Sequence, residues 1–523
     1  MKKLSFLQNA IVLVTSNLIT GALGFLFSII LSREVGAHGV GLYSMVMPVY
    51  SFFICITCGG TTTALSKITA EKNSQHNYKE LYKTITCALA FFIFWTAFIS
   101  ILSVISAPYI STEILKDTRT YLPILSFVPA LIFLSAGSVL KGYFYGMQNS
   151  TFPAVIDITE KCVRLVVLIA LVTRFKALGL KYQIAGAVLA MSAGELTSTA
   201  LLYGFYKKSY LNFGHLTGKP DNVPQIIANI LSTSLPICLN GLFSTAAGSF
   251  IAAMVPRRLY AAGFAAETSL ALFGKVAGMG MNIVMFPSIA IGAISTLLVP
   301  AISEASASGS SFGINKRIYS TIKITTLIAA LSGGLFFELP DELGKLFYNR
   351  ADLGNIIFSL SFGVIFVYVE STLCGILNGL GKQKILLKNT FIMSAIDIAV
   401  LYTFLGIPSI NIYGYAIDFV ISPLMGCILN YSEIRRATDV KISIPEVVIC
   451  PIFLTGCNII FLKTIRPIVF NILKSQNAAI SVLLLTGILS YWAFYLILSP
   501  LFKHGYSSYD TKKPAKRKSN FFF

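Results

Sequence analysis

Long apolar runs follow one another along almost the whole of this 523-residue chain, which is 55% hydrophobic and only 12% charged. Two of these runs, residues 84–107 and 479–502, contain no charged residue. Because the hydrocarbon core of a bilayer offers no water to satisfy backbone N–H and C=O groups, a chain can cross it only as helices or as a closed barrel. The runs are roughly 20 residues long and lack the alternation of barrel strands. The predicted fold class is therefore an all-α polytopic membrane protein.

The apolar runs predict about 14 transmembrane helices. A mean hydropathy of +0.75 is too high for a soluble globular protein and agrees with this number of spans. We place the helices at residues 9–31, 43–66, 84–107, 121–140, 153–173, 184–206, 226–254, 268–300, 324–340, 355–378, 389–406, 412–432, 447–462 and 479–502.

A pattern near the N-terminus recurs further along the chain, which indicates a duplicated architecture. An offset of 233 residues takes Gly41 to Gly274 and Gly142 to Gly375, and an offset of 228 takes Gly186 to Gly414. Each copy holds six predicted helices. Because six is an even number, the second copy enters the membrane in the same orientation as the first. We therefore expect two six-helix lobes related by an axis along the membrane normal, with a central cavity between them.

The repeat also predicts how the chain is divided. We expect an N-terminal lobe with helices 1–6 at residues 1–210, a cytoplasmic linker at 211–224, a C-terminal lobe with helices 7–12 at 225–440, helices 13–14 at 441–502 and a basic cytoplasmic tail at 503–523. The tail is rich in Lys and Arg, which favours disorder and attraction to an anionic membrane surface.

The basic excess follows from membrane topology. The chain has 41 Lys and Arg against 22 Asp and Glu, a net charge of +19. If the N-terminus is cytoplasmic, most Lys and Arg fall in cytoplasmic connections, as the positive-inside rule requires. We therefore expect a multi-pass protein of the cell membrane with both termini in the cytoplasm. Contact with anionic lipid explains the remaining charge, so no nucleic-acid partner is expected.

The sequence gives no support to an enzymatic function. It contains no GxxxxGK[ST] phosphate-binding loop, no HExxH zinc motif and no GxSxG nucleophile motif. Cys55 and Cys58 form a CxxC pair inside a hydrophobic helix without a second pair, which favours packing over zinc or redox chemistry. We expect a protein that is not an enzyme and has no cofactor and no metal site.

The predicted fifth helix is the most polar span. Asp157, Glu160, Lys161 and Arg164 follow one another at steps of three and four residues, so they lie along one stripe. Ionisable groups at this density will not face acyl chains, and the stripe must meet protein, water or headgroups. Two interpretations remain open, namely structural pairing, for example of Glu160 with Arg164, and a substrate site.

Further candidates are isolated polar groups at membrane depth and residues that bend helices or bring them close together. The candidates for the substrate cavity are Asn17, Arg33, Glu160, Arg164 and Lys275. The candidates for coupling to an ion gradient or to the membrane potential are Glu195, Glu370, Asp397 and Asp418. The hinge and packing candidates are Pro48, Gly59, Gly60, Gly142, Gly146, Gly292, Gly375 and Gly379.

The stretch Arg33–Glu71 resembles the N-terminal signature of the stage V sporulation protein B family, with the sequence REVGAHGVGLYSMVMPVYSFFICITCGGTTTALSKITAE. The stretch Ser135–Ala154, SAGSVLKGYFYGMQNSTFPA, supports the resemblance. That family belongs to the multidrug, oligosaccharidyl-lipid and polysaccharide exporter superfamily. The resemblance implies a flippase that works by alternating access on an undecaprenyl-pyrophosphate-linked peptidoglycan precursor for the spore cortex. The implied partners are membrane lipid and the lipid-linked saccharide, with cell-wall synthases as candidate partner proteins.

The resemblance also implies where the substrate binds. In the related peptidoglycan-precursor flippases, basic residues of the central cavity hold the pyrophosphate, and the two additional helices form a groove for the lipid tail. The arginine that those relatives carry after the proline of the second helix has no counterpart at residues 49–53 here. Arg33, Arg164 and Lys275 are candidate replacements, because guanidinium and ammonium groups bind phosphate oxygens well.

Two other functions remain open. A cation-coupled small-molecule antiporter of the same superfamily would depend on carboxylates in its cavity, whereas a pyrophosphate carrier would depend on Arg and Lys. A non-transporting membrane scaffold for cell-wall synthases would need neither set of charges.

Overall fold

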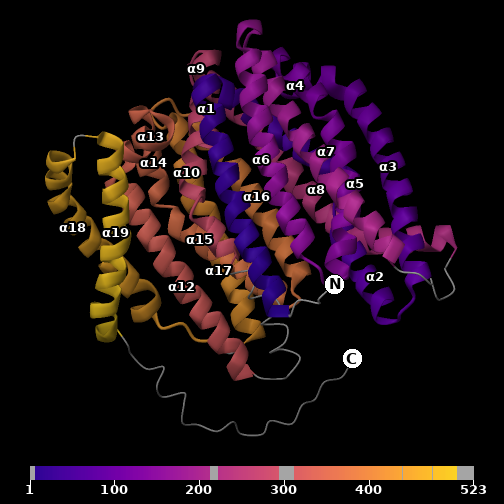
Figure 1. Ribbon diagram of the computed structural model, residues 1–523. Coiled ribbons are helices and arrows are strands. Elements are labelled where there is room, and N and C mark those ends of the chain that lie inside the picture. Colours follow the sequence, from indigo (N-terminus) through magenta and orange to yellow (C-terminus); the bar gives the residue numbers. More distant parts are fainter. Residues whose placement is uncertain (1–5, 213–221, 294–310, 439, 474, 503–523) are drawn as a thin grey trace.

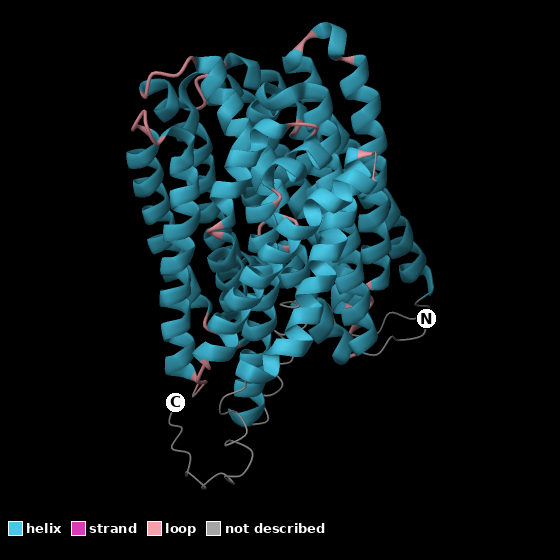
Figure 2. Cartoon of the chain, turned by 90° about the vertical axis from the view of Figure 1, so that its left-hand side faces the viewer, coloured by secondary structure: helices cyan, strands magenta, loops and turns pink. Residues whose placement is uncertain are grey.

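The structure is a computed structural model that describes residues 6–212, 222–293, 311–438, 440–473 and 475–502. Within these residues the chain forms helices and short connections and no strand (Figure 2). The long helices run roughly side by side in one bundle (Figure 1). The predicted all-α membrane fold is thus confirmed.

The chain begins with a helix that changes direction without a loop. Helix α1 spans Phe6–Cys58, and its only non-helical residue is Gly36, with φ 67° and ψ −177°. Glycine tolerates this positive φ because it has no Cβ. The predicted spans 9–31 and 43–66 are therefore joined by a kink, and Pro48 lies inside the helix without ending it. At Gly59 and Gly60, where a bend was expected, the helix is interrupted, and α2 follows at Thr61–Ser74.

The rest of the first half consists of helices that pack around α5. Its elements are α3 (Tyr78–Tyr109), the π-helix η1 (Ile110–Ile114), η2 (Thr118–Thr120), α4 (Tyr121–Ser126), α5 (Val128–Gly146), α6 (Thr151–Arg174), η3 (Lys176–Leu178) and α7 (Leu180–Asn212). Helices α2, α3 and α7 all pack on α5.

The second half begins with α8 after the part of the linker that is not described. Its elements are α8 (Val223–Ala261), α9 (Ala266–Phe273), the π-helix η4 (Gly274–Gly280), α10 (Met281–Met285), α12 (Ser311–Glu338), α13 (Pro340–Tyr348), η5 (Ala351–Leu353), α14 (Gly354–Ser361), α15 (Val364–Gly379), α16 (Gln383–Leu405), η6 (Asn411–Tyr413) and α17 (Gly414–Ala437). The predicted linker, residues 211–224, lies mostly outside the described residues.

Two further helices lie at one edge of the bundle (Figure 1). They are α18 (Cys450–Ile472), preceded by η7 (Pro445–Ile449), and α19 (Gln476–Leu498), followed by η8 (Ser499–Phe502). At one end of this pair, Lys323 Nζ of α12 lies 3.1 Å from Glu446 Oε2 of η7. At the other end, Arg466 of α18 forms an ion pair with Glu342 of α13. These pairs fix both ends of the additional helices to α12 and α13.

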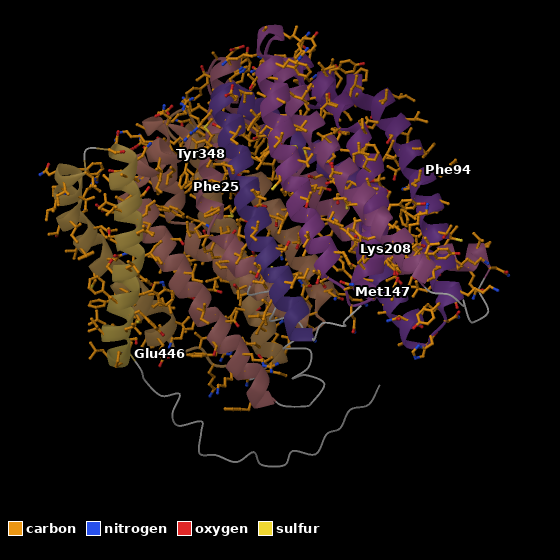
Figure 3. The ribbon with its side chains drawn as sticks, viewed as in Figure 1. Phe25, Phe94, Met147, Lys208, Tyr348 and Glu446 are labelled. Carbon is orange, nitrogen blue, oxygen red and sulfur yellow. The ribbon has the colours of Figure 1, made fainter. Side chains whose placement is uncertain are left out.

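Among the described residues, 11 helices are long and apolar enough to cross a membrane, or up to 12 if the pair Ala351–Ser361 and Val364–Gly379, bent by 57°, is one span. Ile11–Ser74 counts once here although α1 is kinked at Gly36, and the charged helix α6 is not among them. The predicted number of about 14 is compatible with this arrangement. The outer surface of the bundle is apolar, as at Phe94 on α3, whose ring is 76% exposed and points away from the bundle (Figure 3).

Helix contacts are compatible with the predicted repeat. In the first half α6 packs on α1 and α7, and α5 packs on α3 and α7; in the second half α16 packs on α8 and α17, and α15 packs on α12 and α17. The repeat-related glycines Gly41 and Gly274 also touch each other. A Cβ on Gly41 would collide with the carbonyl of Leu270, and a Cβ on Gly274 would collide with that of Ala37. Backbone meets backbone at this point between the halves.

The packing role predicted for two further glycines is visible in the same way. A Cβ on Gly142 would lie 2.8 Å from Leu65 Cβ, and one on Gly146 would lie 2.5 Å from Thr69 Cβ, so these glycines let α5 approach α2. Gly375 and Gly379 occupy the corresponding end of α15. The segment that the repeat would place against them, at residues 294–307, lies outside the described residues.

Candidate functional site

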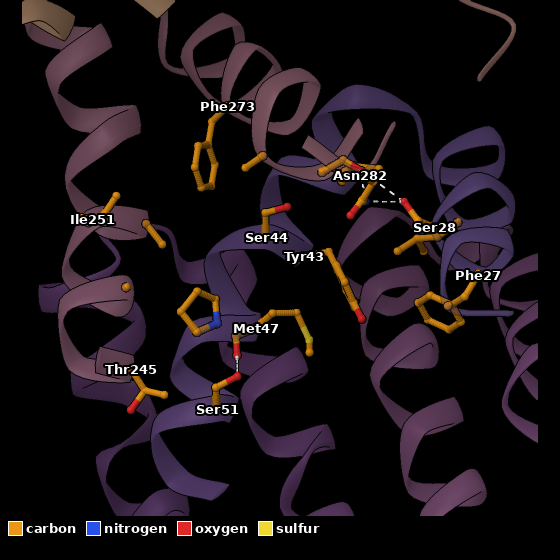
Figure 4. Close-up of a pocket in the computed structure, with 18 of the residues that line it drawn as sticks. Phe27, Ser28, Tyr43, Ser44, Met47, Ser51, Thr245, Ile251, Phe273 and Asn282 are labelled. Carbon is orange, nitrogen blue, oxygen red and sulfur yellow. Dashed lines mark hydrogen bonds between the residues drawn. The ribbon is translucent and has the colours of Figure 1, made fainter. Parts of the chain in front are cut away.

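A central cavity of about 690 Å³ lies between helices of the two halves. Both parts of α1, on either side of the kink, line it together with α6, α8, α9 and η4 (Figure 4). Residues that line it include Phe27, Ser28, Tyr43, Ser44, Met47, Pro48, Ser51, Lys161, Arg164, Thr245, Ile251, Phe273, Asn282 and Tyr415. No Asp or Glu is among the described residues that line this cavity.

Uncharged polar groups form a connected patch on one side of the cavity. Asn282 Nδ2 donates to Ser28 Oγ at 2.6 Å and to the carbonyl of Gly278 at 2.6 Å (Figure 4). Ser28 Oγ also lies 3.0 Å from the hydroxyl of Tyr348 on α13. This patch joins α1 to η4 and α13, and it keeps hydroxyl and amide groups at the cavity wall.

The cations of the cavity are Lys161 and Arg164 on α6. Arg164 Cζ lies 4.5 Å from the centroid of the Phe27 ring, an arrangement in which the ring face attracts the guanidinium. Among the described residues Arg164 forms no ion pair, and its Nε is buried without a hydrogen-bond partner. A buried donor without a partner costs about 1–3 kcal/mol. Arg164 is itself only half-buried and lines the cavity, so its unpaired positive charge can attract an anionic group there.

The other charges of the α6 stripe are paired within the first half. Asp157 Oδ1 lies 2.7 Å from Lys141 Nζ of α5. Glu160, only 4% exposed, pairs with Lys161 at 3.0 Å, so the pairing with Arg164 that the spacing suggested is not formed. The stripe therefore combines both interpretations that the sequence left open, structural pairs on one side and a cavity cation on the other.

Three of the predicted cavity residues lie elsewhere. Arg33 donates through Nε and Nη2 to the carbonyl of Phe347 at 3.2 and 3.0 Å, and it lines a separate pocket of about 580 Å³ beside α13 and α19. Lys275 pairs with Asp352 at 2.7 Å. Asn17 is exposed and does not line the central cavity. The kink at Gly36 directs the Arg33 side chain, and the π-helix η4 directs that of Lys275. Neither the kink nor the π-helix was predicted.

The carboxylates proposed for coupling lie behind the cavity wall. Glu195 is on α7, next to Gly194, where a Cβ would lie 3.0 Å from Glu160 Oε1. Asp397 and Asp418 are on the adjacent helices α16 and α17, and Asp418 Oδ1 is buried without a hydrogen-bond partner. Glu370 on α15 accepts from Cys374 Sγ at 2.8 Å and belongs to a buried polar network.

That network joins three helices of the second half. Asn430 Nδ2 of α17 donates to Glu370 Oε1 at 3.3 Å, and Asn389 Nδ2 of α16 donates to Asn430 Oδ1 at 2.8 Å. Glu370 therefore accepts hydrogen bonds from uncharged partners, whereas Asp157 and Glu160 of the first half form ion pairs with lysines.

The hinge candidates differ in their surroundings. Pro48 lines the central cavity. A Cβ on Gly60, whose φ is 75°, would lie 2.6 Å from the carbonyl of Ser234 on α8. At Gly292 a Cβ would meet no atom of the described residues within 4 Å. The sequence did not single out Ser28, Asn282 or Tyr415, because residues of these types are common on membrane helices and only the fold places them at the cavity.

Comparisons with known proteins agree with this architecture. The family model for polysaccharide biosynthesis proteins matches residues 6–306. The chain is 26% identical to stage V sporulation protein B of Bacillus subtilis (strain 168) over 483 residues, which cover 92% of this chain and 93% of that protein.

Solved structures share the fold. The lipid II flippase MurJ in its inward closed conformation gives a TM-score of 0.66 at 14% identity and covers 94% of this chain and 99% of that chain. An inward-facing multidrug resistance MATE family transporter of the MOP superfamily gives a TM-score of 0.65 at 14% identity, with 82% and 97% covered.

The resemblance to stage V sporulation protein B that was predicted from residues 33–71 is confirmed by similarity along most of the chain. The fold is that of the MOP superfamily, and the family model covers more than half of the chain. The chain is a multi-pass membrane protein that belongs to the polysaccharide biosynthesis protein family.

Proposed function

We propose that this protein is a flippase that moves an undecaprenyl-pyrophosphate-linked saccharide, the peptidoglycan precursor for the spore cortex, across the cell membrane. The lobes at residues 1–210 and 225–440 rock against each other so that the central cavity opens to one side at a time. Both termini lie in the cytoplasm, and cell-wall synthases that use the precursor are candidate partners.

The observation that carries this proposal is the charge of the central cavity. Its wall holds the cations Lys161 and Arg164 and, among the described residues, no carboxylate. A pyrophosphate needs cationic hydrogen-bond donors, and the half-buried guanidinium of Arg164 lines the cavity and forms no ion pair among the described residues. A carrier for cationic drugs would instead need carboxylates at the wall.

The size and surroundings of the cavity suit a large headgroup. Ligand sites span about 300–1,000 Å³, and the cavity of about 690 Å³ falls in this range. Ser28, Asn282 and Thr245 offer hydroxyl and amide groups to a saccharide. The prenyl tail remains in lipid beside α18 and α19.

Alternating access requires contacts between the halves that break easily. At one end of the bundle Arg119 of the first half lies 3.2 Å from Glu267 of the second, whose side chain is 76% exposed. Nearby, Arg257 donates to the carbonyls of Glu113 and Ile114. Exposed ion pairs of this kind contribute about 0–1 kcal/mol, so they can hold one state without locking it.

Coupling to an ion gradient or to the membrane potential would act through buried carboxylates. Glu195 lies behind the cations of the first half, and Asp397 and Asp418 lie together in the second. Moving one charge across the membrane is worth about 2.3 kcal/mol per 100 mV, which is enough to bias two conformations.

The test is transport by the purified protein in vesicles that contain a fluorescent lipid-linked pyrophosphate precursor. Arg164→Ala should lower the translocation rate at least about 100-fold, because truncating one partner of a buried charged hydrogen bond costs about 2–5 kcal/mol. Arg164→Lys should retain part of the rate, since it keeps the charge and loses the planar fork.

Arg174→Ala is the matched control, because Arg174 is an exposed arginine at the end of the same helix. If Arg164→Ala flips the precursor at the wild-type rate, the central cavity does not bind the pyrophosphate through Arg164. Export of cationic dyes without precursor flipping would favour the antiporter, and the absence of any transport under every gradient would favour the scaffold.

A further inference from the structure

A second pocket, here named the lysine–tyrosine pocket, lies between α3 and α7 in the first half and has a volume of about 550 Å³. It shares no lining residue with the central cavity. Lys208, which directly follows one of its lining residues on α7, marks this end of the bundle in Figure 3. The pocket is lined by Lys79, Tyr82, Lys83, Thr86, Cys87, Tyr203, Tyr206, Lys207 and Tyr210.

The pocket has a firm aromatic floor. Helices α3 and α7 both pack on α5, and the hydroxyl of Tyr143 on α5 lies 3.2 Å from that of Tyr82 and 2.8 Å from Ser209 Oγ. The Tyr82 ring packs edge-on against the Tyr210 ring at 4.9 Å. Tyr82 and Tyr206 are only 3% and 7% exposed. The concave shape therefore comes from packed rings and not from the positions of loose side chains.

The charge of the pocket is of one sign. Lys79, Lys83 and Lys207 reach it from two helices, and no carboxylate is among the described residues that line it. The nearest acidic residue along α3 is Glu80, which is 4% exposed and pairs with Lys72 at 2.8 Å outside the pocket. Lys79 on α3 and Lys207 on α7 thus approach the same concavity from two helices, and both attract an anion placed in it.

The surface that continues from the pocket is apolar. Lys83, Cys87, Phe94 and Ile101 follow one another at steps of four and seven residues, so they lie on one face of α3. Phe94 and Ile101 are 76% and 60% exposed on the outside of the bundle (Figure 3). A ligand with an anionic head in the pocket would therefore have hydrocarbon-compatible surface for its tails.

We propose that the lysine–tyrosine pocket binds the headgroup of an anionic phospholipid from the leaflet at this end of the bundle. The ammonium groups contact the phosphodiester oxygens, the exposed tyrosines Tyr203 and Tyr210 contact the glycerol or second headgroup atoms, and the acyl chains run along α3. Basic pockets between membrane helices are known to bind such headgroups, and the volume suits one. The site is separate from the proposed flippase cavity, so it can be tested without transport.

The test is native mass spectrometry of the full purified chain with added dioleoylphosphatidylglycerol or dioleoylphosphatidylcholine. The wild-type protein should retain dioleoylphosphatidylglycerol in preference to dioleoylphosphatidylcholine. The triple variant Lys79→Gln, Lys83→Gln, Lys207→Gln should bind the anionic lipid on the order of 100-fold more weakly, since each basic group near a membrane surface contributes about fivefold. The control triple Lys208→Gln, Lys316→Gln, Lys384→Gln removes the same charge from exposed positions outside the pocket.

A second variant separates a built pocket from diffuse surface charge. Thr86→Trp keeps all three lysines and fills the pocket from an exposed position of α3, and it should weaken binding at least about tenfold while the apparent Tm stays within a few degrees. Equal losses in the two lysine triples, or full binding by Thr86→Trp, would overturn the proposal. Displacement of the lipid by equimolar soluble glycerophosphoglycerol would assign the site to a soluble anion instead and would equally overturn it.

Discussion

At one pair of positions related by the offset of 233 residues, the two halves of the bundle carry opposite charges. In the first half α6 presents Lys161 and Arg164 to the central cavity. The offset of 233 residues takes Arg164 to Asp397 on α16, so the second half has a carboxylate where the first has a guanidinium. The second half holds Asp397, Asp418 and Glu370 without a basic partner among the described residues. We propose that the cations of the first half bind the anion and that Asp397 and Asp418 of the second half, together with Glu195, serve ion coupling.

The largest effect is expected when this difference is erased. Arg164→Asp gives α6 the residue type of α16, removes the cavity donor and adds a charge that repels phosphate. We expect precursor translocation to fall on the order of 1,000-fold, more than for Arg164→Ala. The rate in reconstituted vesicles measures this, with Arg174→Asp as the charge-matched control on the same helix. Equal rates for Arg164→Asp and wild type would contradict the assignment of the basic side.

The contact between the halves can be broken at its centre. Gly41→Leu places a side chain where the carbonyl of Leu270 leaves no room, so the halves must separate. We expect a loss of about 3 kcal/mol or more, seen as a lower apparent Tm in detergent. Gly456→Leu on α18, where nothing lies within reach of a Cβ, should change little. A similar Tm for both variants would mean that the backbone contact does not hold the halves together.

Buried carboxylates should respond with opposite signs in the two halves. Glu160→Gln removes the ion pair with Lys161 and should lower stability by about 2 kcal/mol, because one charge remains without its partner. Asp418→Asn removes a charge whose Oδ1 has no hydrogen-bond partner and should leave stability unchanged or raise it by about 1 kcal/mol. The apparent Tm of each variant at neutral pH shows whether the two substitutions change stability in these different ways. If both variants are destabilised equally, the Asp418 carboxylate has a stabilising partner, and the expected difference between the halves is wrong.

The smallest effect is expected at the exposed pair between the halves. Glu267→Gln removes the exposed carboxylate of the second half that contacts Arg119 and His38 of the first, and it should cost less than about 1 kcal/mol of stability. It should nevertheless raise the reactivity of a cysteine introduced at Ser44 of the cavity by a few fold, because opening at this end becomes easier. Lys116→Gln, which breaks a pair within the first half alone, is the control. Unchanged labelling would exclude this pair from the gate.

The fold was largely predictable from the sequence, because the length of an apolar run and the hydrogen-bonding needs of its backbone leave little choice of structure. The glycine pairs also indicated close packing, and Gly142 and Gly146 lie where a Cβ would meet α2. The kink at Gly36 was not predicted, since a single glycine with positive φ leaves no periodic signal.

The cavity was predictable only in part. A stripe on one helix marked Arg164, because spacing alone places its members on one face. Arg33 and Lys275 went elsewhere because their direction depends on the rotation of α1 and of η4 about their own axes. The contact of Ser28 with Asn282 joins residues 254 positions apart, and no local pattern reports such a pairing.

The contact of Gly41 with Gly274 gives the molecule a fulcrum. At about 1.5 Å per residue, Gly41 lies about 6 Å from Ala37, where the second part of α1 begins, and about 25 Å from its end at Cys58. The two lever arms are therefore unequal, in a ratio of about one to four. A small tilt of the halves, which parts the pair Arg119 and Glu267 only slightly at the short arm, moves the far end several times further. In the rocking motion that we propose, the two ends of the central cavity therefore open by different widths, and the wider opening lies at the end of the long arm.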